Sequence, residues 1–217
     1  AGLSTTNFAA LSTDRLQALT TQQAAALNSS QTAALTTAKA VILETADLAA
    51  LSTSALNALG TTNIKALTTV QLQSLTTSQV LALATDALAA LTTDRVVALT
   101  TGQVAALSST QLGALTTSQI AAIETADLNV LTGVQVLGLT TAGVVALGTA
   151  GVVTLTTGAI AGLGTTNTTA LTAAQITALT SSQISALTTS QLVAIETQDI
   201  QALKTSQLAT IATSTVA

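Results

Sequence analysis

The sequence predicts an all-α fold: a solenoid of very short helices, one in each eight-residue repeat. Three observations predict it. A leucine or isoleucine recurs at every eighth residue from Leu3 to Ile211, and the register never slips. Threonine or serine pairs usually follow it, and these residues favour helix starts over helix interiors. Alanine, leucine and glutamine, which are good helix formers, occupy much of the rest, and proline is absent.

Each repeat, or octad, is numbered here from its leucine as position 1. Of 27 octads, 24 have Leu at position 1 and three have Ile. Position 3 is Thr or Ser in 25 octads, the exceptions being Gly133 and Ala173. Gln is the commonest residue at position 5, position 6 is usually Val, Ile or Leu, and position 8 is usually Ala. The consensus is therefore L-T-T-x-Q-(I/V/L)-x-A.

The threonine pair supplies two candidate helix starts. Thr at position 3 could be the N-cap, whose hydroxyl accepts an orphan N–H of the first turn. Thr at position 2 with Gln at position 5 also forms a capping-box pattern, as in Thr76 and Gln79, with flanking apolar residues placed as a staple. Aspartates fall in the same first turn, where the helix dipole favours an acid, at Asp47, Asp86, Asp94, Asp127 and Asp199.

One continuous helix does not fit an eight-residue period. Eight residues at roughly 100° each overshoot two turns by about 80°, so an apolar stripe would wind around the helix axis. We therefore expect one helix of less than two turns in each octad, followed by a break. Such a helix is unstable alone in water, so stacking between neighbouring octads must stabilise it.

A β-solenoid with two or three octads per coil is the alternative fold. Residues 140–153, with paired valines and several glycines, favour it. The abundance of Ala disfavours it, as does Leu rather than Val or Ile at position 1, because these residues are less typical of strands.

No linker or change of composition interrupts the repeat, so we expect residues 1–217 to form a single continuous array. The array starts and stops in mid-pattern, which suggests a segment of a longer repeat protein. The octads around 128–170, rich in Gly and Val, depart from the consensus and predict some local irregularity.

Composition excludes several classes of function. The 217 residues include no His and no Cys, so they offer neither an imidazole base nor a thiolate. Five scattered cations and a net charge of -4 do not form the basic stripe that nucleic-acid binding needs. Mean hydropathy is +0.64 and residues 128–195 carry no charge, but Thr or Ser interrupts each apolar run. We therefore expect no membrane span.

The sharpest polar features are three acidic pairs. They could be catalytic carboxylates or ligands of a hard cation, but a calcium site needs more oxygens and a glycine-shaped loop. We interpret them instead as helix-start charges, and expect no catalytic, cofactor-binding or metal site. The pairs are Glu44/Asp47, Glu124/Asp127 and Glu196/Asp199.

Two further groups of residues receive structural interpretations. Asp14–Arg15 and Asp94–Arg95 are expected to be solvated surface pairs. Glycines at position 2 are expected to replace Thr at a turn, namely Gly60, Gly148 and Gly164. The spacing of Gly143, Gly148 and Gly151 matches no phosphate-binding loop.

The octads at residues 75–82 and 115–122 resemble the L-T-T-x-Q-V-x-A-L tandem arrays of very large bacterial surface or secreted proteins, often described as adhesin-like or haemagglutinin-like. The resemblance covers nearly the whole chain. It implies a bacterial, exported protein with a non-enzymatic role.

These observations predict a structural array: an extracellular or cell-surface stalk, matrix or filament-forming region that associates with itself, end to end or laterally. It would need no cofactor. The alternative is a binding module, either for a surface ligand of unknown identity or for ice, through the regular threonines. An enzyme is not expected.

Overall fold

The computed structural model describes residues 3–195, 197–201 and 203–214. The chain forms two compact units, residues 1–106 and 107–217, and each is described by itself. Within the described residues every regular element is a helix, so the all-α solenoid is confirmed and the β-solenoid alternative is wrong.

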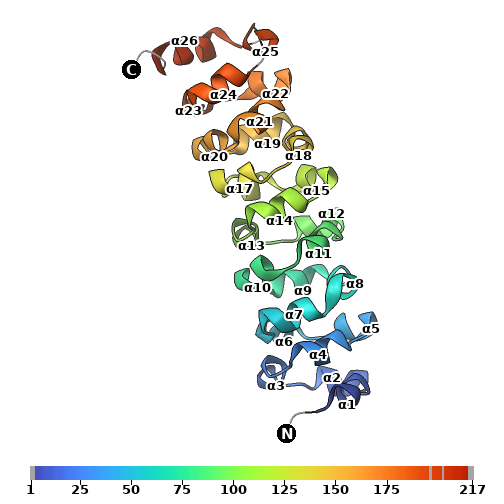
Figure 1. Ribbon diagram of the computed structural model, residues 1–217. Helices are drawn as coiled ribbons and strands as arrows, with labels where there is room; N and C mark the ends of the chain where they lie inside the picture. Colours follow the sequence, from blue (N-terminus) through green and yellow to red (C-terminus); the bar gives the residue numbers. More distant parts are fainter. Residues whose placement is uncertain (1–2, 196, 202, 215–217) are drawn as a thin grey trace. The chain divides into compact units, whose positions relative to one another are not determined.

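Both units consist of short helices, one per octad, except that α26 continues through Ile211 into the following octad (Figure 1). The helices of unit 1 are α1 Thr5–Ala9, α2 Thr13–Gln17, α3 Thr21–Ala25, α4 Ser29–Ala33, α5 Thr37–Ala40, α6 Thr45–Ala50, α7 Thr53–Ala58, α8 Gly60–Ile64, α9 Thr69–Ser74, α10 Thr77–Ala82, α11 Thr85–Ala89, α12 Thr93–Val97 and α13 Thr101–Ala105. Those of unit 2 are α14 Ser109–Ala114, α15 Thr117–Ala122, α16 Thr125–Leu128, α17 Gly133–Leu137, α18 Thr141–Ala146, α19 Gly148–Thr154, α20 Thr157–Gly162, α21 Gly164–Thr169, α22 Ala173–Ala178, α23 Ser181–Ala186, α24 Thr189–Ala194, α25 Thr197–Gln201 and α26 Thr205–Ser214.

The helix begins after position 2, which decides between the two candidate caps. Thr76 has extended dihedrals (φ -68°, ψ 156°), and its hydroxyl accepts the backbone N–H of Gln79. The position-3 residue, Thr77, is already the first helical residue. The capping-box interpretation is therefore confirmed, and the N-cap at position 3 is wrong. The side chain that caps must precede the helix, because only there can its oxygen face the free N–H groups of the first turn.

The helix ends where the next position-1 leucine turns extended. Leu75 has φ -63° and ψ 138°, and its N–H donates to the Leu72 carbonyl oxygen at 3.2 Å. This bond spans three residues rather than four, as in a 3₁₀ turn. The remaining carbonyl groups at the helix end must find partners elsewhere.

Three octads use a different connection. Leu59 stays helical (φ -57°, ψ -28°), and the following Gly60, the first residue of α8, adopts φ +75°. Gly148 and Gly164 repeat this with φ +65° and +72°. A side chain disfavours this left-handed backbone, so glycine replaces Thr at these turns, as expected from the sequence.

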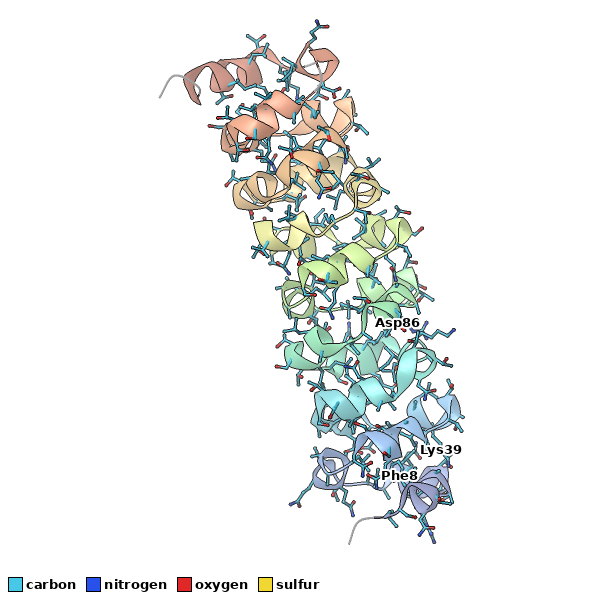
Figure 2. All side chains as sticks on the ribbon, in the orientation of Figure 1. Phe8, Lys39 and Asp86 are labelled. Carbon is cyan, nitrogen blue, oxygen red and sulfur yellow. The ribbon has the colours of Figure 1, made fainter. Side chains whose placement is uncertain are left out.

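Within each unit, a helix packs on the helix three octads away. Examples are α4 on α7 in unit 1 and α17 on α20 in unit 2. One coil therefore contains three octads. Positions 1 and 6 point into the coil and form the core, as at Leu75 and Val80. Phe8, at position 6 of its octad, lies in this core of unit 1 and is only 1% exposed (Figure 2).

In unit 2, the backbones of neighbouring coils nearly touch at several glycines. A Cβ at Gly162 would lie 2.2 Å from the Gly133 Cα, and a Cβ at Gly138 would lie 2.1 Å from the Ser109 carbonyl oxygen. These glycines bring α14, α17 and α20 closer than alanine at position 8 would permit. They account for part of the irregularity expected around residues 128–170.

Candidate functional site

The repeated polar site of this protein is the side chain at position 5. In α13, Gln103 is the third helical residue and is only 2% exposed. Its Oε1 accepts the backbone N–H of Thr100 at 2.9 Å, which completes the capping box. Its Nε2 donates to the carbonyl oxygens of Leu72 at 2.8 Å and Leu75 at 2.7 Å, in the preceding coil.

We call this arrangement the clamp: a position-5 side chain that donates to carbonyl oxygens about 28 and 31 residues earlier. One coil is 24 residues, so the clamp joins a helix start to a helix end in the coil before it. The amide thereby satisfies orphan groups of two different helices. Other glutamines that make one or both bonds are Gln31, Gln71, Gln79, Gln135, Gln175, Gln183, Gln191 and Gln207.

Cations at position 5 make the same clamp. The Arg95 Nε donates to the Leu67 carbonyl oxygen at 2.7 Å, and an Nη donates to that of Ala66 at 3.4 Å. Lys39 donates through Nζ to the Ala9 carbonyl oxygen (Figure 2). The expected solvated pair Asp94–Arg95 is therefore wrong for Arg95, because its guanidinium binds backbone of the preceding coil. Arg15, in the first coil, is exposed.

Asparagine uses a shorter version of the clamp. The Asn63 Nδ2 donates to the Leu35 carbonyl oxygen at 2.9 Å, and its Oδ1 accepts the Thr37 hydroxyl at 2.8 Å. Asn167 likewise donates to the Leu139 carbonyl oxygen at 3.0 Å. Thr37 stands 26 residues before Asn63, at position 3 of the preceding coil.

Aspartate at position 5 has no such donor. Asp47 is only 2% exposed, and its Oδ2 is buried without a hydrogen bond. Burial raises the pKa of its carboxyl group, and the nearby charge of Glu44 raises it further, while a hydrogen bond with Thr21 partly offsets both. Glu44 is the N-cap residue of α6 and makes no side-chain cap hydrogen bond.

The acidic pairs lie where the sequence places them, at helix starts. Asp47 and Asp127 are in the first turns of α6 and α16, after Glu44 and Glu124 at the N-caps. Asp199 is in the first turn of α25, whereas Glu196 lies outside the described residues. In the part of the chain that the structure describes, acidic side chains do not gather in threes as a metal site would require.

Sequence reasoning missed the clamp, although a signal was present. Charged residues concentrate at position 5, in the slot that glutamine otherwise fills. They are Arg15, Lys39, Asp47, Arg95, Asp127 and Asp199. A solvated surface position would scatter such charges across the octad, so this clustering indicates a common polar function.

These features define the class of protein, a repeat protein in which a helical solenoid is built from octapeptides. The family model for the ALTTAQ repeat matches residues 41–77, 96–122 and 120–157. The chain is thus an octapeptide tandem-repeat array whose octads are similar to the ALTTAQ repeat. Neither the curated proteins nor the solved structures compared with the chain match it. None of the described helices is long and apolar enough to cross a membrane.

Proposed function

We propose that this chain is a non-enzymatic structural array, an exported stalk, matrix or filament-forming region at the cell surface that associates with itself. The repeated clamp is the observation that supports the proposal. The position-5 amides of both units bind backbone of the same chain, from Gln31 to Gln207. Polar groups engaged in this way build a regular scaffold and leave few groups for chemistry.

Electron microscopy and analytical ultracentrifugation of the purified chain test this proposal. We expect extended particles that form larger species as the protein concentration rises. Compact particles that stay monomeric at all concentrations would contradict it. Surface labelling of the intact source cell, with and without permeabilisation, separately tests the exported location.

One observation favours a binding module as the second candidate. Position 2 provides the cap, so capping does not account for the threonines at position 3, and Thr77, Thr117 and Thr157 are exposed. Regularly spaced hydroxyls and methyls could match an ordered ligand surface such as ice. Thermal hysteresis that is lost when one column of position-3 threonines is replaced by lysine would support it. Unchanged freezing behaviour would count against the ice version.

A further inference from the structure

A full coil of unit 2 lacks the clamp. Position 5 is Gly143, Gly151 and Ala159 in three consecutive octads, so none of these octads provides a side-chain donor there. In unit 1, alanine occupies position 5 only in isolated octads, at Ala55 and Ala87. The helix ends in the coil before residues 143–159 therefore keep carbonyl groups that a clamp would otherwise bind.

Gly151 lines a cavity of about 420 Å³ in unit 2. By the clamp register, a side chain at residue 151 would donate to the carbonyl oxygens of Ile120 and Ile123. Both residues line the cavity, with Leu128 and Leu147 as further apolar walls. The Ile120 oxygen accepts only the backbone N–H of Ile123, at 3.2 Å, and the described residues provide no donor for the Ile123 oxygen.

The rim of the cavity is acidic. Glu124 lines it as the exposed N-cap residue of α16, and its side chain makes no cap hydrogen bond. Residues 128–195 contain no cation, so no lysine or arginine of that stretch offsets the charge of Glu124. The site combines free acceptors, negative charge and apolar walls.

The chain itself shows which groups bind such carbonyls. Lys39 and Arg95 occupy the same octad position in unit 1, where an ammonium and a guanidinium donate to the carbonyl oxygens at the end of a helix. Charge-assisted hydrogen bonds of this kind are stronger than those of a neutral amide. A cation with N–H donors would therefore replace the missing glutamine and also meet the charge of Glu124.

We propose that the cavity at Gly151 binds the guanidinium or primary ammonium head of an aliphatic cation, whose carbon chain packs on Ile120, Leu128 and Leu147. This binding site goes beyond the proposed structural role and does not depend on it. The same head group occurs on small molecules and on arginine and lysine side chains, and the test separates these two sources.

Saturation-transfer NMR and calorimetry with n-butylguanidinium and n-butylammonium test the proposal on the whole chain. Both should bind, whereas butyltrimethylammonium, which has the charge but no N–H donor, should not. N-acetylarginine amide represents a protein side chain. If it binds as tightly as n-butylguanidinium, an arginine of another protein fits the site, and if it binds much more weakly, the site prefers a free small molecule.

Matched variants locate the site. Glu124→Gln should weaken binding roughly threefold to tenfold, because it removes the charge at the rim. Glu44→Gln is the control and should leave binding unchanged. Glu44 corresponds to Glu124 in unit 1, but there Gln71 occupies the position that corresponds to Gly151 and already binds the carbonyl oxygens of Ala40 and Leu43. Gly151→Gln should abolish binding by filling the site with its own amide.

A Cβ at residue 151 would lie 3.1 Å from the Leu147 Cβ and 3.2 Å from the Leu128 Cδ1, so circular dichroism must confirm that Gly151→Gln folds. If it does not fold, the Glu124 and Glu44 variants decide. Equal binding by wild type and Glu124→Gln, equal binding of butyltrimethylammonium, or no binding of either primary head group would overturn the proposal.

Discussion

At the scale of single residues, stability depends on the donor at position 5. Gln, Asn, Lys and Arg differ in length and charge, yet Gln103, Asn63, Lys39 and Arg95 all donate to backbone carbonyls of the preceding coil. Their common property is an N–H group that reaches a buried acceptor. A buried acceptor without a partner costs about 1–3 kcal/mol, so the donor matters more than the rest of the side chain.

Replacement of one clamp tests this directly. Gln103→Ala removes the cap acceptor and three hydrogen bonds to the preceding coil, to the carbonyl oxygens of Leu72, Gln73 and Leu75, so we expect the free energy of unfolding to fall by about 2–3 kcal/mol. Gln73→Ala, at an exposed site of the same unit, should change it by less than about 0.5 kcal/mol. Urea denaturation measures both. Gln103→Lys should recover part of the loss, and equal losses in the two alanine variants would refute the clamp.

Asp47 predicts an unusual dependence of stability on pH. Because burial raises the pKa of this carboxyl in the folded state, the folded protein keeps the proton at pH values where the unfolded chain has lost it. The contribution of Asp47 is therefore most favourable below the unfolded value of about 3.9, and it is lost as pH rises through the folded pKa.

Asp47→Asn removes this charge and should imitate Asn63, with a donor toward the preceding coil and an acceptor toward Thr21. We expect a higher melting temperature at neutral pH and a smaller gain from acidification. Asp94→Asn, at an exposed first-turn position, is the control and should show neither effect. Thermal melts at a series of pH values measure the difference, and a lower melting temperature at pH 7 for Asp47→Asn would contradict the interpretation.

At the scale of the element, each helix is defined by its start. Helices such as α13 and α10, with five and six residues, make too few internal bonds for independent stability, so the capping box and the buried residues on either side of it fix where the helix begins. Thr76 accepts the N–H of Gln79, and Gln79 accepts the N–H of Thr76 at 2.8 Å. The flanking Leu75 and Val80 are both buried, as a hydrophobic staple requires.

The two threonines of one octad should therefore differ sharply in their contribution. Thr76→Ala removes the cap, and we expect a loss of about 1 kcal/mol in the free energy of unfolding. Thr77→Ala changes the exposed first helical residue, and its effect should stay within about 0.5 kcal/mol. Denaturation of the two variants side by side measures the contrast, and a larger loss for Thr77→Ala would place the cap at position 3 after all.

The helix and its capping box could be predicted from the sequence because both depend on residues within one octad. The Thr76 and Gln79 spacing is a local signal, and so is the drift of an eight-residue period around a helix. The clamp could not be predicted, since it depends on the number of octads in a coil. An eight-residue period is the same for two, three or four octads per coil. Nothing in that period places Arg95 opposite Leu67, or leaves the Oδ2 of Asp47 without a hydrogen bond.

At the scale of the whole molecule, the repeat makes each unit a stack of coils whose contacts with one another are nearly equivalent. The departures are specific: the close approach of Gly133 and Gly162, and the coil without clamps at Gly143, Gly151 and Ala159. In a stack of this kind, stability is a sum over repeats and their neighbours rather than a property of one central core. Stability should then depend more strictly on the unbroken eight-residue register than on the sequence of any one octad.

Deletions separate phase from content. Removal of residues 75–82 takes out one whole octad of unit 1, and every later helix of this unit still meets the helix three octads before it. The later position-5 donors of unit 1 still face carbonyls about 28 and 31 residues earlier, because equivalent positions in successive octads carry similar residues. We expect this variant to keep its helical circular dichroism and a cooperative unfolding transition.

Removal of residues 78–81 takes out only half as many residues. It leaves the first three residues and the last residue of the octad at 75–82 joined together, and it eliminates both Gln79 and Val80. One short helix is lost, its buried positions no longer face the core, and the later helices are displaced by half a repeat. We expect this smaller deletion to cost about 4 kcal/mol or more, well beyond the effect of the larger one. If the eight-residue deletion were the more damaging of the two, stability would depend on particular octads. The contacts between successive coils would then not be equivalent.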